Sequence, residues 1–217
     1  MKRVAVVLVA ALAVQPVVRA AAPAAPAADP PPTDPQALVQ SVTERVLATL
    51  RSGAVAGDEA ALREKVRELI LPHLDFVAMS KLVLGKHWRR ATAEQREAFV
   101  AAFRRLLVDT YESALTKYRD EEVVFLPFRP GRDPERLAEV RCEIRRAGGP
   151  PIPIVYSLRF KPEDGWKVYD IAIEGVSLVT NYRSSFSQEI DRNGLDALIA
   201  RLEARGDGEA VGEGGAS

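Results

Sequence analysis

The sequence holds few of the residues on which catalysis, metal binding and cross-linking depend. Among 217 residues there is one cysteine, Cys142, and there are two histidines, His73 and His87. A single cysteine excludes an intramolecular disulfide. Its alternation with Val140 and Ile144 predicts an apolar position inside a sheet, and a reactive thiol is the alternative. The histidines stand outside HExxH and other metal-binding spacings, so we expect no metal site and no cofactor.

Catalytic motifs are missing as well. The sequence contains no G-x-S-x-G elbow, no Walker loop and no G-x-G-x-x-G fingerprint. Ser177 is predicted to cap a helix, and nothing in the sequence nominates a base for a serine nucleophile. Asp170 and Glu174 lie four residues apart in a predicted strand, so they share a face and are candidates for an acid–base pair. Hydrogen bonds at the end of the sheet, or pairing of Asp170 with an arginine, are the favoured interpretation.

An unbroken apolar run, Val4–Val14, follows Lys2 and Arg3 at the N-terminus. The run is about half of the roughly 20 residues that a membrane-spanning helix needs. A positive start, a short apolar run and small residues beyond it predict a cleaved secretory signal rather than a retained anchor. No cysteine follows the run, so a lipoprotein is not expected.

Neither sign of charge dominates, because 30 Lys and Arg balance 30 Asp and Glu. Removal of the signal leaves a mildly acidic chain, which argues against nucleic-acid binding driven by phosphate neutralisation. About 190 residues remain, enough for one sizeable core. Composition divides the chain into a signal at 1–22, an Ala/Pro linker at 23–35, a folded domain at 36–204 and a disordered Gly/Glu tail at 205–217.

Apolar residues recur every three to four positions in the first half of the folded domain and predict helices. Asp34 is expected to cap the first helix, and Gly53 to end it. Thr92 and Gln95 form a capping box at the start of the longest helix. The predicted helices cover 35–51, 58–72, 75–84, a long segment after 92, a segment after Gly175, and 195–202.

The period then shortens to two and predicts four strands, at 122–128, 136–145, 152–160 and 166–173. Gly- and Pro-containing connections favour an antiparallel meander. In the last strand, alternation places Tyr169, Ile171 and Ile173 on one face, and Trp166, Val168 and Ala172 on the other. At Glu174–Gly175 the period changes to that of a helix.

A cationic run, Lys86–Arg90, contains Trp88. One interpretation is a solvated loop whose tryptophan packs inward. The other is a rim that attracts anionic lipid headgroups or an acidic protein face.

Several short stretches resemble the MlaC family, auxiliary components of toluene-tolerance and Mla lipid-transport ABC systems. They cover most of the chain between residues 36 and 204, in the family's order and spacing. The matching pieces are Leu69–Pro72 with Phe76, Leu82–Gly85, Trp88 followed by Ala91–Phe99, Phe103–Arg104 through Tyr111 to Tyr118, Gly165–Asp170, and Glu174–Leu178.

The resemblance implies an α+β fold in which several helices pack on a four-stranded antiparallel sheet and enclose an apolar lipid pocket. It further implies a periplasmic phospholipid carrier that maintains outer-membrane lipid asymmetry in a Gram-negative cell. Its partners would be an outer-membrane lipoprotein–porin complex and an inner-membrane ABC transporter with its substrate-binding component. The family has no catalytic residues to transfer to this chain.

We therefore expect a set of apolar residues to line the pocket, and three arginines, Arg89, Arg90 and Arg96, to contact the headgroup or a partner. Mobile elements are expected around the mouth, at Pro72–Gly85 and at the Gly175 corner. Two alternatives remain: an adaptor of an ABC transporter that carries nothing, and a small exported hydrolase that uses Asp170 and Glu174. The predicted lining is Leu82, Leu84, Phe103, Leu107, Tyr111, Tyr156, Tyr169, Ile171 and Val176.

Overall fold

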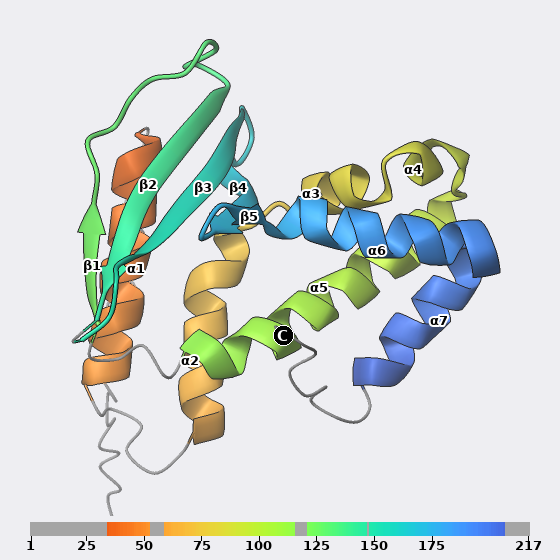
Figure 1. The fold of residues 1–217 in the computed structure, drawn as a ribbon, viewed down its shortest axis with the longest axis horizontal. Helices are drawn as coiled ribbons and strands as arrows, with labels where there is room; N and C mark the ends of the chain where they lie inside the picture. The colour runs from red at the N-terminus through yellow and green to blue at the C-terminus, as the bar shows by residue number, and fades with distance from the viewer. Residues whose placement is uncertain (1–33, 53–58, 116–120, 147, 207–217) are drawn as a thin grey trace, which may run out of the picture. The chain divides into compact units, whose positions relative to one another are not determined.

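A computed structural model describes residues 34–52, 59–115, 121–146 and 148–206 of the chain (Figure 1). The predicted signal, nearly all of the predicted linker, Gly53 and the residues after 206 lie outside this part. Within it, no helix combines the length and the apolar content that crossing a membrane requires.

Helices form where the sequence period predicts them, with one further short helix at Lys86–Arg90. In the described residues they are α1 (Pro35–Arg51), α2 (Glu59–Ile70), the 3-10 turn η1 (Leu71–His73), α3 (Phe76–Leu84), α4 (Lys86–Arg90), α5 (Ala93–Leu115), α6 (Leu178–Asn193) and α7 (Leu195–Gly206).

The predicted helix caps are confirmed. The Asp34 carboxylate accepts from the backbone N–H of Gln36 at 2.7 Å. In the capping box, Gln95 N–H donates to the Thr92 hydroxyl, and Thr92 N–H donates to the Gln95 side chain. Ser177 caps α6 in the same manner, through the N–H of Thr180.

The loop interpretation of Lys86–Arg90 is wrong, because this segment is the short helix α4. Gly85 separates α3 from α4 with a positive φ of 51°, a conformation that favours glycine. A Cβ at this position would also lie 3.0 Å from the Arg183 guanidinium of α6. Gly85 therefore permits both the change of direction and the close approach of α6.

The predicted four-stranded antiparallel meander is confirmed, and a fifth short strand extends it. The strands pair in sequence order as β1 (Glu122–Phe125), β2 (Leu137–Arg145), β3 (Ile152–Lys161), β4 (Gly165–Ile173) and β5 (Val176–Ser177). Glu174 and Gly175 join β4 to β5, and both have positive φ, as a two-residue type I′ hairpin requires. The sequence pattern missed β5 because it has only two residues before α6 begins.

A β-bulge in β4 changes which residues share a face. The register steps from Leu158 opposite Val168 to Ser157 opposite Asp170, so Tyr169 is the extra residue. Because alternation restarts after the bulge, Ile171 lies on the same face as Val168. The predicted grouping of Tyr169 with Ile171 and Ile173, opposite Trp166 and Val168, is therefore wrong.

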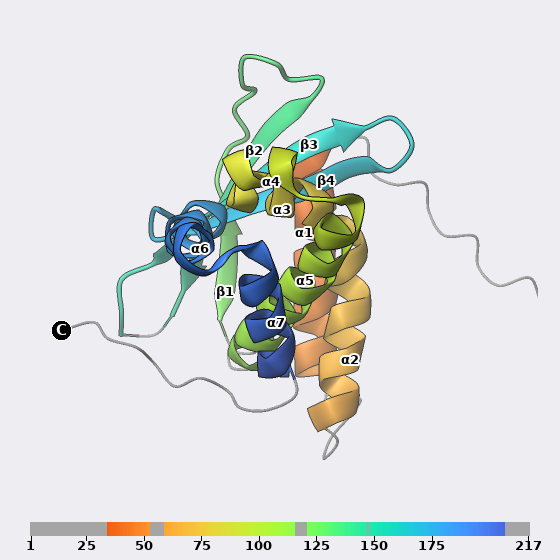
Figure 2. The same cartoon turned by 90° about the vertical axis from the view of Figure 1, so that its right-hand side faces the viewer.

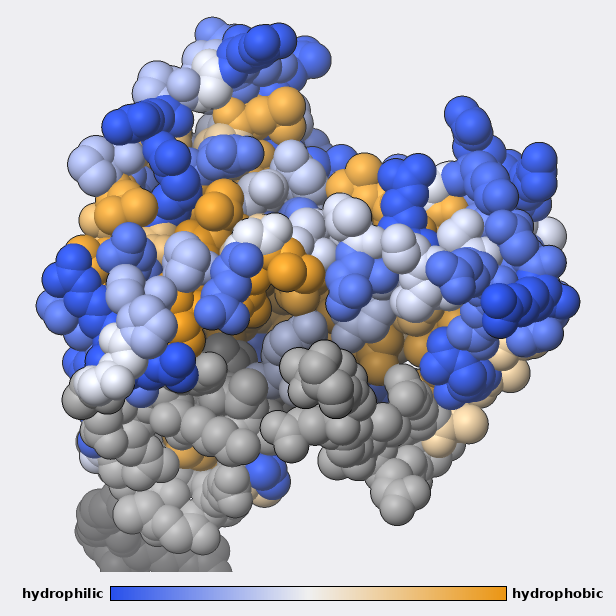
Figure 3. Space-filling view, in the orientation of Figure 1, coloured by the Kyte–Doolittle hydropathy of each residue, from blue (hydrophilic) through white to orange (hydrophobic). Residues whose placement is uncertain are grey.

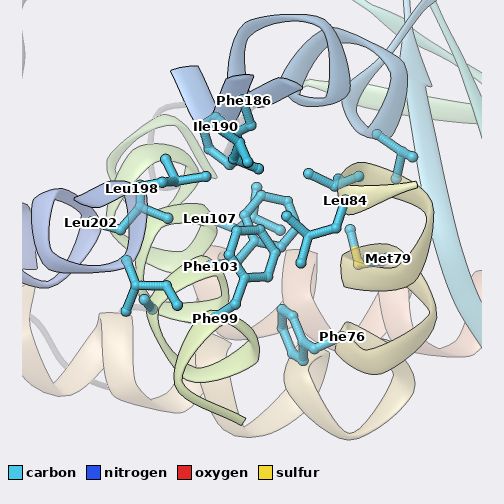
Figure 4. Close-up of a cluster of buried hydrophobic side chains, with 14 residues drawn as sticks. Phe76, Met79, Leu84, Phe99, Phe103, Leu107, Phe186, Ile190, Leu198 and Leu202 are labelled. Carbon is cyan, nitrogen blue, oxygen red and sulfur yellow. The ribbon is translucent and has the colours of Figure 1, made fainter. Parts of the chain in front are cut away.

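Helices α1, α2 and α5 lie on one side of the sheet (Figure 2). Side chains of α1 pack with the middle of this sheet face around Val140 and Leu158, and α1 also packs with α2 around Val46 and Val66. A third cluster joins α3, α5, α6 and α7, and Figure 4 shows its side chains pointing toward one another. In it Phe99 stacks on Phe103 with ring centroids 5.6 Å apart.

Candidate binding cavity

A cavity of about 430 Å³ lies between the apolar face of the sheet and helices α1, α2 and α5. This is well above the ~150 Å³ of a cavity that accepts benzene, and it falls within the range of roughly 300–1,000 Å³ typical of ligand pockets. Its wall is almost entirely hydrocarbon. Such a space suits a long apolar ligand.

Cross-strand pairs build the sheet side of the cavity. Ile152 stands opposite Ile144, Ile154 opposite Ile173, and Tyr156 opposite Ile171. Directly opposed residues point to the same face of a sheet, so all six side chains line the cavity. The β4 bulge is necessary for this arrangement, because without it Ile171 and Ile173 would point to the other face.

Four of the nine predicted lining residues meet in this wall. Leu107 and Tyr111 come from α5, Tyr156 from β3 and Ile171 from β4. They lie far apart in the sequence, and the pairing of β3 with β4 and the packing of α5 bring them together.

The other five predicted residues do not line the cavity. Leu84 and Phe103 are fully buried in the cluster between the helices. Leu82 is 39 % exposed on α3, and Val176 is 58 % exposed on β5. Tyr169 is the unpaired residue of the bulge.

Helices α1 and α2 supply a large share of the wall that the predicted lining set did not include. The apolar stripe of α1 predicted a buried helix face, but periodicity alone does not tell a cavity wall from a packed core. These residues are Leu38, Val39, Val42, Val46, Leu47 and Leu50 from α1, and Val66 and Ile70 from α2.

The polar groups in the wall are mostly uncharged. Burial raises the pKa of Tyr156, whose hydroxyl is hydrogen-bonded to the Cys142 thiol. Burial likewise raises the pKa of Tyr111, which bonds to Tyr182. Burial, and then the charges of Lys167 and Arg45, lower the pKa of His73, which is therefore neutral at neutral pH.

Cys142 is fully buried on the apolar face of β2, as the alternation of its neighbours predicts. Burial raises the pKa of its thiol to about 11. The thiolate is the nucleophilic form, so this environment contradicts the alternative of a reactive cysteine.

The three predicted arginines do not line the cavity and lie on α4 and at the N-terminal end of α5. Arg89 and Arg90 are exposed on α4. Arg96 donates from Nε to the Trp88 carbonyl at 3.0 Å, and its guanidinium lies 5.5 Å from the centre of the Trp88 ring. Lys81 approaches the same ring at 5.7 Å, so cation–π contacts hold the tryptophan between two helices.

An open groove of about 850 Å³ runs along α2, α3, α4 and α5 beside these residues. Arg67, Leu71 and Val108 line both this groove and the cavity, so they form the wall between the two. Of the described residues that line the cavity, Arg67 alone carries a full charge, and it pairs with Glu64 at 3.3 Å.

Asp170 holds the end of the sheet to the start of α6. Its carboxylate accepts from the Ser177 hydroxyl at 2.6 Å, from Val179 N–H at 3.1 Å and from Ile171 N–H at 2.9 Å. Glu174 is exposed in the hairpin turn. The prediction of hydrogen bonds at the end of the sheet is thus confirmed for Asp170, and they leave it tied to structure rather than poised as an acid or base.

The predicted mobile segment at Pro72–Gly85 is bonded to β4 at its start. Asp75 N–H donates to the Val168 carbonyl at 2.8 Å, and Lys167 Nζ donates to the Pro72 carbonyl at 2.7 Å. Asp75 is buried, caps α3 through Ala78 N–H, and lies 2.7 Å from Arg159 Nε. Mobility of this segment stays a prediction.

Helices packed on an antiparallel meander, with a hydrocarbon-walled cavity between the two layers, define an α+β protein built to hold an apolar ligand. The chain belongs to the MlaC family, whose family model, MlaC protein, matches residues 40–204. The resemblance seen in the sequence is therefore confirmed.

Two relatives extend this comparison. The intermembrane phospholipid transport system binding protein MlaC of Haemophilus influenzae is 27 % identical over 175 residues, which cover 79 % of this chain and 81 % of that protein. The toluene tolerance protein ttg2D of Pseudomonas putida is 27 % identical over 165 residues, or 75 % of each chain.

A solved structure shares the fold. It is the phospholipid-binding protein of Ralstonia solanacearum in complex with a phospholipid. It is 31 % identical, with a TM-score of 0.71, and the match covers 80 % of this chain and 97 % of that one.

Proposed function

We propose that this protein is a periplasmic phospholipid-binding component of a lipid-transport system. The observation that carries the proposal is the hydrocarbon-walled cavity of about 430 Å³ in a chain of this family. The names of the relatives support it, since one belongs to an intermembrane phospholipid transport system and another is a phospholipid-binding protein.

The physical need for such a cavity is large. Each methylene exposed to water costs about 0.8 kcal/mol, so two ordinary acyl chains cost on the order of 20 kcal/mol. A wall of aliphatic side chains from α1, α2, α5 and the sheet offsets that cost without any chemical reaction. The headgroup, which is well hydrated, would remain in solvent.

In the finer proposal the protein shuttles phospholipid between an outer-membrane lipoprotein–porin complex and an inner-membrane ABC transporter with its substrate-binding component. This exchange would maintain the lipid asymmetry of the outer membrane. The predicted secretory signal over residues 1–22 would deliver the chain to the periplasm.

Two matched variants on one hairpin test whether the cavity holds the lipid. Ile171→Glu places a carboxylate in the wall, whereas Val176→Glu places the same group on an exposed residue five positions later. An unpaired carboxylate strongly disfavours an apolar surrounding, so Ile171→Glu should lose co-purifying phospholipid and Val176→Glu should keep it. Mass spectrometry of protein purified without detergent measures both.

Circular dichroism and thermal melting establish that each variant is folded. Should folded Ile171→Glu keep as much phospholipid as the unaltered protein, the cavity is not the lipid site. If Ile171→Glu fails to fold, Val42→Trp provides an apolar substitution in the same wall and asks the same question.

A further inference from the structure

Positive charge is concentrated in one segment of a chain whose net charge is zero. Between residues 76 and 105 there are seven lysines and arginines against two acids, Glu94 and Glu97, so the segment carries five net positive charges. His87 adds none at neutral pH, because burial first and then nearby cations lower its pKa against the opposing effect of Asp191. This segment makes up α3, α4 and the first half of α5.

The same segment exposes large aliphatic side chains. Val77 is 44 % exposed and Leu82 is 39 % exposed on α3, with Lys81 exposed between them. Figure 3 shows hydrophobic surface beside strongly hydrophilic surface at the place where Figure 1 puts α3. The opposite side of α3, which includes Met79 and Val83, is buried against the helical cluster.

Helix α4 continues this surface with Lys86, Arg89 and Arg90, all exposed. Lys86 pairs with Asp191 of α6 at 3.1 Å. Among the described residues, neither Arg89 nor Arg90 has an acidic partner within ion-pair distance. Two arginines therefore present charge outward at the end of the aliphatic surface.

This surface also adjoins the cavity. Val77 and Trp88 line the open groove, and the groove shares Leu71 and Val108 with the cavity wall. The exposed surface of α3 therefore lies on the other side of this shared wall from the cavity.

We propose that the exposed side of α3 and α4, consisting of Val77, Lys81, Leu82, Lys86, Arg89 and Arg90, docks on the surface of an anionic phospholipid bilayer. We name it the α3–α4 face. The inference rests on the proposed function, since a phospholipid carrier has to reach a source of lipid. Aliphatic side chains ringed by lysine and arginine suit shallow insertion among acidic headgroups. An acidic protein face would pair with the cations but would leave Val77 and Leu82 against polar groups, whereas the region just below acidic headgroups accepts aliphatic side chains, which favours a bilayer.

Vesicle sedimentation tests this docking with the mature chain. One set of vesicles contains phosphatidylcholine alone, and the other contains equal parts phosphatidylcholine and phosphatidylglycerol. We expect binding to the anionic vesicles only, with weaker binding as salt is raised, because salt screens exposed charges.

Charge-removing variants locate the contact. Each basic side chain near an anionic surface contributes about a fivefold change in partition, so Arg89→Gln with Arg90→Gln should weaken binding roughly 20- to 30-fold. The matched control, Arg129→Gln with Arg132→Gln, removes two exposed arginines between β1 and β2 and should leave binding within about twofold. Leu82→Ser tests the aliphatic contribution and should also weaken binding.

Three results would overturn the docking proposal: no binding of the unaltered protein, equal binding to both kinds of vesicle, or equal losses in the two double variants. Phospholipid content measured on the same preparation of unaltered protein distinguishes failure of the docking proposal from failure of the proposed function. Protein that carries phospholipid but does not sediment contradicts the docking alone. Protein that sediments but carries no phospholipid contradicts the carrier function alone.

Discussion

Filling the cavity with a larger apolar side chain should stabilise the lipid-free protein while it excludes the lipid. Val42 on α1 is partly buried and lines the cavity. An aromatic side chain buries about 150–250 Å², and tryptophan adds roughly 100 Å² over valine. At ~25 cal/mol per Å² this contributes about 2.5 kcal/mol, of which about 1–2 kcal/mol should remain after the loss of rotamer freedom.

Val140→Trp is the matched control. Val140 is fully buried on the sheet face that bounds the cavity, but it does not line the cavity. Overpacking a filled core costs about 1–3 kcal/mol, so this variant should be destabilised. Urea unfolding of delipidated protein measures both free energies of unfolding, and mass spectrometry measures phospholipid content. Equal destabilisation of the two variants would refute the cavity. Stabilisation of Val42→Trp with unchanged phospholipid content would refute its assignment as the lipid site.

Further predictions concern three residues outside the cavity's hydrocarbon wall. Asp75→Asn removes one partner of a buried ion pair whose other partner, Arg159, is one third exposed, so the free energy of unfolding should fall by about 2–3 kcal/mol in urea; an unaltered midpoint would contradict this. Burial alone would raise the pKa of Asp75, but the Ala78 N–H and the charge of Arg159 lower it. The carboxylate therefore contributes to the free energy of unfolding above about pH 3.8, and this contribution is lost as the pH falls further. Unfolding free energy measured against pH should show this loss in the unaltered protein but not in Asp75→Asn. Asp170→Asn should lower stability by about 1–2 kcal/mol and leave phospholipid content unchanged, whereas lipid hydrolysis lost in this variant would favour the hydrolase. Cys142 should react with a thiol reagent only after denaturation, and prompt reaction of the folded protein would contradict its burial.

Local features of the fold were predictable from the sequence because local chemistry determines them. The caps at Asp34, Thr92 and Ser177 each satisfy free backbone N–H groups within three residues. Strand alternation likewise predicted the meander. These signals require no knowledge of what lies across the molecule.

Features that depend on distant parts of the chain were not predictable in this way. The bulge at Tyr169 changes the faces of β4, and only the pairing with β3 reveals it. Phe103 and Leu107 belong to one apolar stripe of α5, yet Phe103 meets the helical cluster while Leu107 also reaches the cavity. Periodicity identifies a buried face but not whether side chains or empty space lie opposite it.

The resemblance to the MlaC family implied a pocket, and the structure assigns its wall to α1, α2, α5 and the sheet. The apolar stripe of α1 shows why the predicted lining set left this helix out. Its spacing is that of an ordinary core helix, and part of it does pack against Val140 and Leu158.

Native mass spectrometry of the mature protein purified from cells without detergent, followed by organic extraction of its ligand, tests the carrier function directly. We expect one phospholipid-bearing species, which becomes lipid-free in Ile171→Glu. A lipid-free mass that persists after incubation with phospholipid vesicles would contradict the carrier function and favour an adaptor that carries nothing.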